Sequence, residues 1–318
     1  MKVSIIIPVY NAVAFIPRCV EALKSQTMKD FEVIFVDDCS QDASVAMLER
    51  VCARDTRMKL IVQKENHGPM IARRTGTGAA RGEYVFYADV DDILPSKALE
   101  GLLTREADII IGQCVEQLPS RKMRDLPQSL PYGDDKLSVY RALINRKITC
   151  ALWGKLIRRS LLEKDDFEYI DGLKYGEDFV MYLQIIERAS TYALVGEKVY
   201  IYRYEPESLS NIKTKEQLLG YIRAYSWKLN FLAPYAELKK DLDRDLVLFM
   251  VSRMKEGLSV NDIVFAGGFD LKRYFEFGSL RTSFSFWKSS KLYFFYHLPW
   301  FRKLYGNVVY PLRKRLHD

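Results

Sequence analysis

Three carboxylates stand within four positions in the stretch YADVDD, at Asp89, Asp91 and Asp92. They follow an apolar run, residues 84–88, that is typical of a buried strand. Packed carboxylates repel one another and raise one another's pKa unless a cation or hydrogen-bond donors compensate. Magnesium-type ions bind oxygen and typically use one or two carboxylates together with substrate phosphate oxygens. On an extended backbone, Asp89 and Asp91 would point to the same side. The pair therefore predicts a divalent-cation site, and an ordinary surface turn is the alternative.

A second acidic pair, Asp37 and Asp38, opens the segment DDCSQD after the apolar run 31–36. Asp and Ser suit turns and helix N-caps, so local capping is one interpretation. The other is binding of a nucleobase, because an ionised aspartate only accepts hydrogen bonds and matches the N3–H donor of a uracil ring. The residues alone leave both interpretations open.

A third acidic pair, Glu177 and Asp178, follows Gly176 where a helical pattern begins. Acidic side chains at a helix N-terminus are stabilised by the helix dipole and by free backbone N–H groups. Either carboxylate is also a candidate general base, if burial or a neighbouring charge tunes its pKa.

Alternating strands and helices are predicted to position these acids. Apolar, β-branched runs predict strands at 3–8, 31–36, 59–63, 84–88, 108–114 and 198–204. Helical spacing of apolar residues predicts helices at 15–26, 43–53, 69–81, 137–145 and 176–189, and the Pro-rich stretch 118–135 reads as a loop. This order is typical of an α/β fold with a doubly wound, mostly parallel sheet flanked by helices. Ligands bind such sheets at the carboxyl ends of the strands, where PVYN, DDCSQD and DVDD all fall.

The character of the chain changes near residue 212. Helical periodicity dominates from about residue 214 to 255, so we expect one domain at 1–212 and a helical C-terminal region at 213–318. Residues 281–315 carry eight Arg or Lys, no acid and many aromatic rings. Such a composition suits a segment at an anionic membrane surface. The alternative is that the rings pack onto the first domain or a second subunit.

Composition narrows the function classes. The 318 residues carry a net charge of +7, and the five cysteines are scattered without a C-x-x-C pair, which argues against zinc or disulfides and favours a reducing compartment. No apolar run is long enough for a spanning helix, so we expect a cytoplasmic protein, peripheral at most at the inner face of the cell membrane. No zinc-finger or RNP-type pattern supports nucleic-acid binding. The segment GTGAARG at 76–82 lacks the spacing and the place of a dinucleotide fingerprint, and no glycine-rich loop follows the first strand.

Five segments in order resemble the inverting family two of nucleotide-sugar glycosyltransferases, which have the GT-A fold: SIIIPVYN, VDDCSQD, ENHGPMIARRTGTGAARGEYVFYADVDD, WGKLIRRSLL and YGEDFVMYLQIIERA. The resemblance makes residues 1–212 a GT-A domain. It implies transfer of a hexosyl or N-acetylhexosaminyl group to a hydroxyl of a glycan or lipid-linked acceptor in surface polysaccharide or glycoconjugate synthesis. A catalytically inactive module that binds nucleotide-sugar or a protein partner is the alternative.

For the donor, the resemblance implies eight residues: Pro8, Val9 and Tyr10 lining the uridine pocket, Asp38 accepting from the uracil ring, Asp89 approaching the ribose, Arg73 facing the diphosphate, and Arg203 and Ser208 in the loop that closes over the diphosphate. UDP is the expected nucleotide, with GDP and dTDP open. Arg74 stands where the family pattern usually has Asn.

For the chemistry, the resemblance implies that Asp91, paired with Asp89, binds Mn²⁺ or Mg²⁺. It makes Asp178 the general base of a single in-line displacement, with Glu177 positioning the base or the acceptor. Trp153 and Lys155 fall where related enzymes meet the acceptor, and a core position for Trp153 is the equal alternative.

Overall fold

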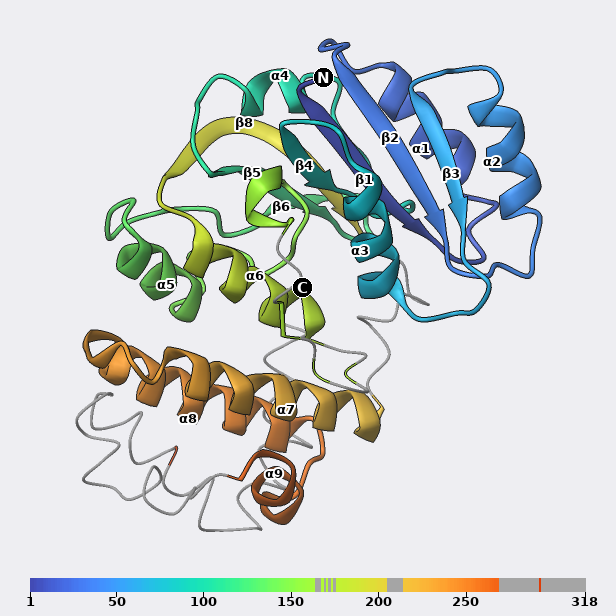
Figure 1. Cartoon of the computed structure of the whole chain (residues 1–318). Coiled ribbons are helices and arrows are strands. Elements are labelled where there is room, and N and C mark those ends of the chain that lie inside the picture. The colour runs from blue at the N-terminus through green and yellow to red at the C-terminus, as the bar shows by residue number, and fades with distance from the viewer. Residues whose placement is uncertain are drawn as a thin grey trace. The chain divides into compact units, whose positions relative to one another are not determined.

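The computed structural model describes residues 1–163, 167–168, 170, 173, 176–204, 214–268 and 292. The chain divides into two compact units, which are described separately below (Figure 1). The first comprises Met1–Asp171 with Glu177–Asn211, and the second comprises Gly172–Gly176 with Ile212–Asp318.

The described strands of the first unit form one eight-stranded mixed sheet (Figure 1). Its strands are β1 Val3–Val9, β2 Phe31–Asp37, β3 Met58–Val62, β4 Tyr84–Tyr87, β5 Ile109–Gln117, β6 Met123–Asp125, β7 Lys155–Arg158 and β8 Tyr192–Arg203. The order is β3-β2-β1-β4-β7-β5-β6, with β8 paired to β5. Strands β1 to β4 are parallel, β7 runs antiparallel between β4 and β5, and β8 is parallel to β5.

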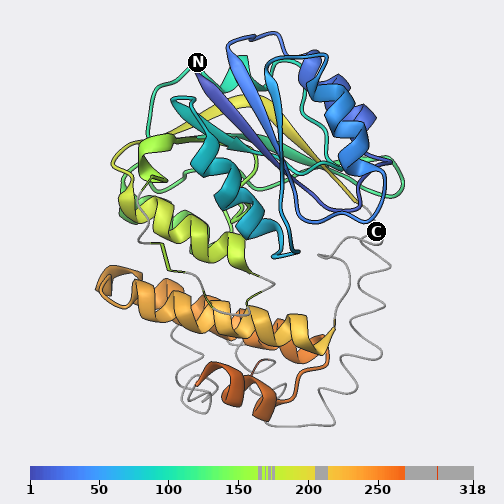
Figure 2. The same ribbon diagram turned by 45° about the vertical axis from the view of Figure 1, so that its right-hand side comes forward.

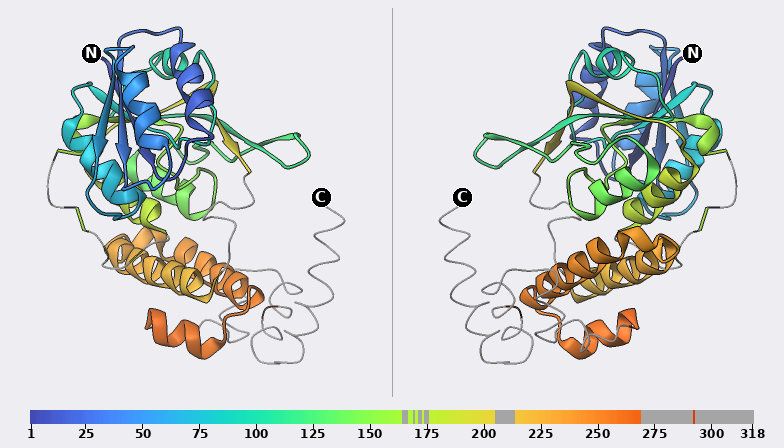
Figure 3. Two further views of the ribbon diagram at one scale, coloured as in Figure 1. Left: turned by 90° about the vertical axis from the view of Figure 1, so that its right-hand side faces the viewer. Right: turned by 90° about the vertical axis from the view of Figure 1, so that its left-hand side faces the viewer.

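Helices cover both faces of this sheet (Figures 2 and 3). They are α1 Ile16–Lys24, α2 Ser44–Cys52, α3 Pro69–Ala79, α4 Ala98–Leu102, α5 Lys136–Ile144 and α6 Glu177–Arg188, with a 3₁₀ turn, η1, at Arg159–Leu161. Alternate β1 residues from Val3 to Val9 share one core with buried residues of α1, α2 and α4. On the opposite face α3 crosses β1 and β2, and a Cβ at Gly76 would lie 2.5 Å from Ile6 Cγ2. Glycine therefore lets α3 lie close to the sheet.

The predicted fold class is confirmed, and the predicted elements through α6 agree within a few residues. Several features differ. The short helix α4, Ala98–Leu102, was not predicted. Strand β7 was not predicted, because its four residues begin with a lysine and lack an apolar run. Strand β8 has 12 residues, although only its last part was predicted. The predicted loop contains β6, which pairs with β5 in a hairpin that projects from the unit (Figure 3).

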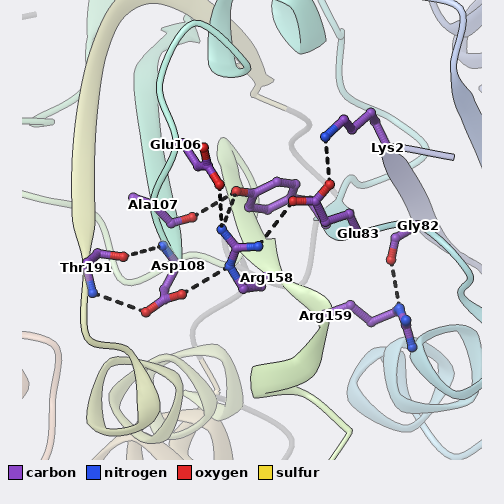
Figure 4. Close-up of polar contacts among 10 residues, drawn as sticks. Lys2, Gly82, Glu83, Glu106, Ala107, Asp108, Arg158, Arg159 and Thr191 are labelled. Atoms are coloured by element: carbon purple, nitrogen blue, oxygen red, sulfur yellow. Dashed lines mark hydrogen bonds and ion pairs between the residues drawn. The ribbon is translucent and has the colours of Figure 1, made fainter.

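An ionic network fixes β7 at the amino ends of β4 and β5 (Figure 4). The Arg158 guanidinium contacts Glu83 and Asp108, each at 3.1 Å, and donates to the Tyr84 hydroxyl at 3.0 Å. Lys2 contacts the same Glu83 at 2.7 Å. Because charge-assisted bonds to one planar guanidinium fix its direction, this network sets the register of the antiparallel strand.

The second unit is helical in its described part, as predicted. It contains α7 Lys215–Leu232, the 3₁₀ turn η2 Ala236–Leu238, α8 Lys239–Lys255 and α9 Val260–Gly267. A buried pair joins α7 to α8: the Lys228 ammonium lies 2.6 Å from the Asp245 carboxylate, which also accepts from the Tyr225 hydroxyl at 2.8 Å. In the part of the chain that the structure describes, no helix combines the length and apolar character needed to cross a membrane. Apart from Leu292, the tail at 281–315 lies outside the described residues.

Candidate active site

The topology gathers the predicted site residues at one edge of the sheet. The carboxyl ends of β1, β2, β4 and β8 lie there, because these strands share one direction. Strand β7 is antiparallel to β4, so the loop that precedes it, residues 149–154, reaches the same edge. Ser208 lies outside the described residues, and its predicted place in a diphosphate loop stays a prediction.

Asp38 organises the loop that enters α3. Its side chain is buried, and Oδ1 accepts from Gln63 Nε2 at 3.1 Å and from the His67 N–H at 2.9 Å. Oδ2 accepts from the Gly68 N–H at 2.7 Å. Gly68 has φ +87°, a conformation that favours glycine. A carboxylate offers about four lone-pair positions, so three donors still allow one further donor such as a uracil N–H.

The ends of β1 and β2 are tied to each other beside Asp38. The Asp38 N–H donates to the Val9 carbonyl at 2.8 Å, and the Asn11 side chain accepts from the Gln41 N–H at 2.7 Å. Val9 itself is buried, whereas the Tyr10 side chain is 50% exposed. Of the predicted uridine-pocket residues, Tyr10 is thus the one that presents a large ring to solvent at this edge; Pro8 is half-buried.

The DVDD segment is a turn. The Asp92 N–H donates to the Asp89 carbonyl at 3.3 Å, and the Asp91 carbonyl accepts from Arg18 Nη2 at 2.8 Å and Arg203 Nη1 at 3.4 Å. The expectation of a locally extended backbone is therefore wrong, because the hydrogen-bonded turn sets the directions of the side chains. Two arginines from distant elements hold the turn by its main chain.

Asp92 and Tyr200 hold this turn from its buried side, and neither was assigned a role from the sequence. Asp92 is buried, and its Oδ1 accepts from the Arg203 N–H at 2.8 Å. Burial, together with the negative charges of Asp89 and Asp91, raises the pKa of Asp92 well above its ordinary value. The Asp89 N–H donates to the Tyr200 hydroxyl at 2.9 Å, and the Tyr200 ring stacks on Trp153 at 4.8 Å. A run of three acids gives no sign of which one points inward.

Arg73 joins two of the three acidic pairs. Its guanidinium is buried, with Nη2 at 2.8 Å from Asp89 Oδ1 and Nη1 at 2.8 Å from Asp178 Oδ1. These two carboxylates lie 89 positions apart in the sequence and remain partly accessible, with 31% and 26% of their side chains exposed. The geometry is that of one buried cation shared by two partly exposed acids. Arg73 was predicted to face a diphosphate, and here its charge is directed to carboxylates.

Burial raises the pKa of both acids at the start of α6. It raises the pKa of Asp178 above the ordinary value, while Arg73 opposes that rise. It raises the pKa of Glu177 to about 7, with the negative charge of Asp178 adding to the effect. Partly buried carboxyl groups with a raised pKa are candidates for proton transfer, because a general base works best with a pKa near the working pH.

The two predicted acceptor residues are buried. Trp153 is 9% exposed and stacks between Tyr200 and Tyr202, which agrees with the core alternative. The Lys155 side chain is fully buried, and its ammonium donates to the Ala151 carbonyl at 2.7 Å. As placed, Lys155 does not face solvent, so this structure gives it no surface on which to meet an acceptor.

The donor set fits a divalent cation bound together with a phosphate ligand. Among the described residues, no group of three or more His, Cys, Asp or Glu side chains is arranged to hold a metal ion by itself. Asp89 and Asp91 supply two carboxylates at one turn, which matches magnesium-type ions that complete their shell with substrate phosphate and water. An anionic diphosphate approaching these acids without a cation would be repelled.

Comparison with known proteins agrees with this geometry. The family model of glycosyl transferase family 2 matches residues 4–164, and EpsJ of Bacillus subtilis (strain 168), an uncharacterized glycosyltransferase, is 32% identical over 251 residues, 73% of this chain and 70% of EpsJ. The chain belongs to glycosyl transferase family 2. This family membership makes it a glycosyltransferase.

Solved structures share the fold of this family 2 protein. Residues 1–349 of S. aureus TarS in complex with UDP-GlcNAc give a TM-score of 0.68 at 20% identity, covering 92% of this chain and 87% of that one. The mannosyltransferase PcManGT from Pyrobaculum calidifontis, in complex with GDP-Man and Mn²⁺, gives 0.53 at 14% identity, covering 97% and 88%. At these identities the likeness shows the fold alone, which is the predicted GT-A type.

Glu177→Gln should stabilise the protein at alkaline pH. Between the ordinary value of 4.5 and the folded value of about 7, the unfolded chain loses the Glu177 proton while the folded chain keeps it. The contribution of Glu177 to stability therefore falls as pH rises through this window. We expect the variant to exceed the wild type by on the order of 1–2 kcal/mol in free energy of unfolding at pH 8 and to match it near pH 4.5.

Denaturant unfolding at the two pH values measures this difference. The matched control is Glu21→Gln, which replaces an exposed acid on α1. Its free energy of unfolding should equal that of the wild type at both pH values. A constant difference between Glu177→Gln and the wild type across the pH range would contradict the raised pKa.

Proposed function

We propose that this protein is an inverting, metal-dependent glycosyltransferase that moves a sugar from a nucleotide-sugar, with UDP the expected nucleotide, to an acceptor hydroxyl. The observation that carries the proposal is the bridge from Asp89 through Arg73 to Asp178. It brings the D-x-D turn, where the donor diphosphate would bind, into contact with an acid suited to deprotonate an acceptor. A module that only binds nucleotide-sugar has no need of the second acid.

The donor class has support from the related structures. TarS, whose fold this chain shares, has been solved with UDP-GlcNAc, and PcManGT with GDP-Man. In this chain, Asp38 keeps one acceptor position for a base N–H, and the exposed Tyr10 ring lies at the same edge. A base that stacks on an aromatic ring and donates to Asp38 satisfies both features.

The transfer would be a single displacement. The acceptor oxygen attacks the anomeric carbon as Asp178 takes the hydroxyl proton, the bond from that carbon to the phosphate oxygen breaks, and the electron pair leaves with the diphosphate. Configuration inverts, because attack comes from the face opposite the nucleotide. Arg73 holds Asp178 ionised and oriented before the acceptor binds, since a neighbouring cation favours the charged carboxylate.

Asp91 and Asp89 are the residues that would hold Mn²⁺ or Mg²⁺. Such an ion would neutralise charge on the departing diphosphate, as cation clamps do. Arg203, whose N–H donates to Asp92 and whose guanidinium donates to the Asp91 carbonyl, would add its positive charge to that neutralisation.

Two relatives and the composition of the chain support a proposal for the acceptor and the setting. One relative of this chain is named for succinoglycan biosynthesis, and another for glucosylation of poly(ribitol-phosphate). We place the acceptor hydroxyl on a glycan or a lipid-linked glycan in surface polysaccharide or glycoconjugate synthesis, with a hexosyl or N-acetylhexosaminyl group transferred. The basic, aromatic residues 281–315 would then hold the enzyme at an anionic membrane on its cytoplasmic side.

Asp178→Asn should abolish most turnover and spare donor binding. Removing a general base costs typically ~10²–10⁴-fold in rate, so we expect a loss of at least about 10²-fold. The assay is release of nucleoside diphosphate from a panel of nucleotide-sugars with Mn²⁺, and calorimetry with UDP measures donor affinity. Asp125→Asn, an exposed acid on β6, is the control. Turnover close to wild type in Asp178→Asn would remove Asp178 from the mechanism.

Asp91→Ala should lose the metal-dependent part of nucleotide binding. Without this carboxylate the cation loses a ligand, and we expect UDP affinity in the presence of Mn²⁺ to fall by at least about 10-fold. Titration of UDP into the variant with Mn²⁺, and then with EDTA, separates the metal-dependent part from the rest. An unchanged affinity with Mn²⁺ would show that Asp91 binds no metal.

A further inference from the structure

We propose that Arg18 is a positioning residue for the metal-binding turn, and that it sets the affinity of the site for a divalent cation bound together with a nucleotide. It acts through the main chain of Asp91 and does not itself touch the cation. The inference rests on the proposed function and adds to it a residue of α1 that lies outside the five segments that carry the family resemblance.

One peptide unit of the turn is held at both of its ends. It joins Asp91 to Asp92, and its carbonyl accepts from Arg18 Nη2 at 2.8 Å. The N–H of the same unit belongs to Asp92 and donates to the Asp89 carbonyl at 3.3 Å. Because a trans peptide is planar, with its C=O and N–H pointing in opposite directions, the two bonds together fix its orientation. The unit is bonded to the Cα of Asp91, so its orientation restricts the directions open to the Asp91 carboxylate.

Arg18 makes the shorter of the two arginine contacts with this carbonyl. Arg203 Nη1 lies 3.4 Å from the Asp91 carbonyl oxygen, beyond the usual range of a hydrogen bond from nitrogen to oxygen, whereas the 2.8 Å contact of Arg18 is within it. Among the described residues, the buried Nε of Arg18 has no hydrogen-bond partner. The hydrogen bond to the turn is therefore what orients this half-buried guanidinium.

The place of Arg18 in its own helix is locally unfavourable. Helix α1 begins at Ile16, so Arg18 lies in its first turn, and that turn contains no acid. The N-terminal end of a helix already carries a partial positive charge, so a cation is disfavoured there. Residues that conflict with local preference are expected mainly at functional sites, where another contact compensates. For Arg18, the compensating contact is with the metal-binding turn.

Helix α1 is fixed in place independently of Arg18. Before the helix begins, the Ala12 N–H donates to the hydroxyl of the buried Ser44, the first residue of α2, at 2.9 Å. Just past its other end, Gln26 Nε2 donates to the Pro95 carbonyl at 2.8 Å, in the segment that follows the turn. A substitution at position 18 therefore removes a contact with the turn and leaves the attachments of the helix intact.

The decisive experiment separates the metal-dependent part of nucleotide binding from the rest. Calorimetry measures the affinity of the full-length protein for UDP with Mn²⁺, and again with EDTA. A residue that positions a metal ligand affects only the first affinity, whereas a residue that contacts the nucleotide affects both. Arg18→Met keeps much of the aliphatic part of the side chain and removes the charge and the donors.

We expect Arg18→Met to weaken UDP binding with Mn²⁺ by about 10-fold, because groups that orient a metal ligand contribute strongly to metal affinity. With EDTA, the UDP affinity of this variant should stay within about twofold of the wild type, since the contacts made without metal are unchanged. In the double variant with Asp91→Ala, Arg18→Met should cause no further loss, because both substitutions act on the same metal ligand.

Two further variants complete the test. Lys24→Met replaces an exposed lysine on the same helix, and its affinities should equal those of the wild type. Arg18→Lys keeps a charge and a donor without the planar fork of arginine, so it should show a smaller loss, again only with Mn²⁺, and it decides the matter if Arg18→Met does not fold.

Two results would overturn the inference. One is wild-type affinity of Arg18→Met for UDP with Mn²⁺. The other is an equal loss with Mn²⁺ and with EDTA, because Arg18 would then contact the nucleotide itself. Unchanged binding of UDP with Mn²⁺ by Asp91→Ala would instead overturn the metal site of the proposed function.

Discussion

Arg73 is the cation that allows acids from distant parts of the chain to lie together at one edge of the sheet. Its two Nη atoms each lie 2.8 Å from a carboxylate, one on the turn after β4 and one at the start of α6. Removing a charge from water is costly, so a buried guanidinium persists only when it is paired. The charge of Arg73 in turn favours the ionised form of Asp178. Arg73 lies on α3, and Gly76 lets this helix pack close to the sheet. The position of α3 therefore also brings the positive charge of Arg73 to the two acids.

The remaining elements can be understood as supports for that arrangement. The turn at Asp89–Asp92 is held through its main chain by Arg18, Arg203 and Tyr200. On the other side, the antiparallel β7 returns the loop 149–154 to the same edge of the sheet. The ionic network at Arg158 fixes the far end of the same strand.

Much of this arrangement could be predicted from the sequence. The β-branched runs and intervening helical patterns were enough for the parallel half of the sheet, and the rule that ligands bind at strand carboxyl ends placed Asp38 and Asp89 at one edge. Asp178 lies at the start of a helix, and only the family resemblance singled it out as the base. Strand β7 and the orientation of Lys155 could not be found in this way, because a lysine within a short segment gives no apolar periodicity. The burial of the Asp92 side chain could not be predicted either, because adjacent acids in a turn differ only through the partners that the fold brings to them.

The central claim is that Arg73 keeps Asp178 in the ionised form that a base requires. The pH dependence of kcat at saturating donor, measured for the wild type and Arg73→Met, tests this claim most directly. Arg50→Met, an exposed arginine on α2, controls for the loss of a cation. The account predicts that the acid limb of the profile moves to higher pH in Arg73→Met only, because the base then loses its ion pair. A profile that keeps its acid limb in place while kcat falls would contradict it.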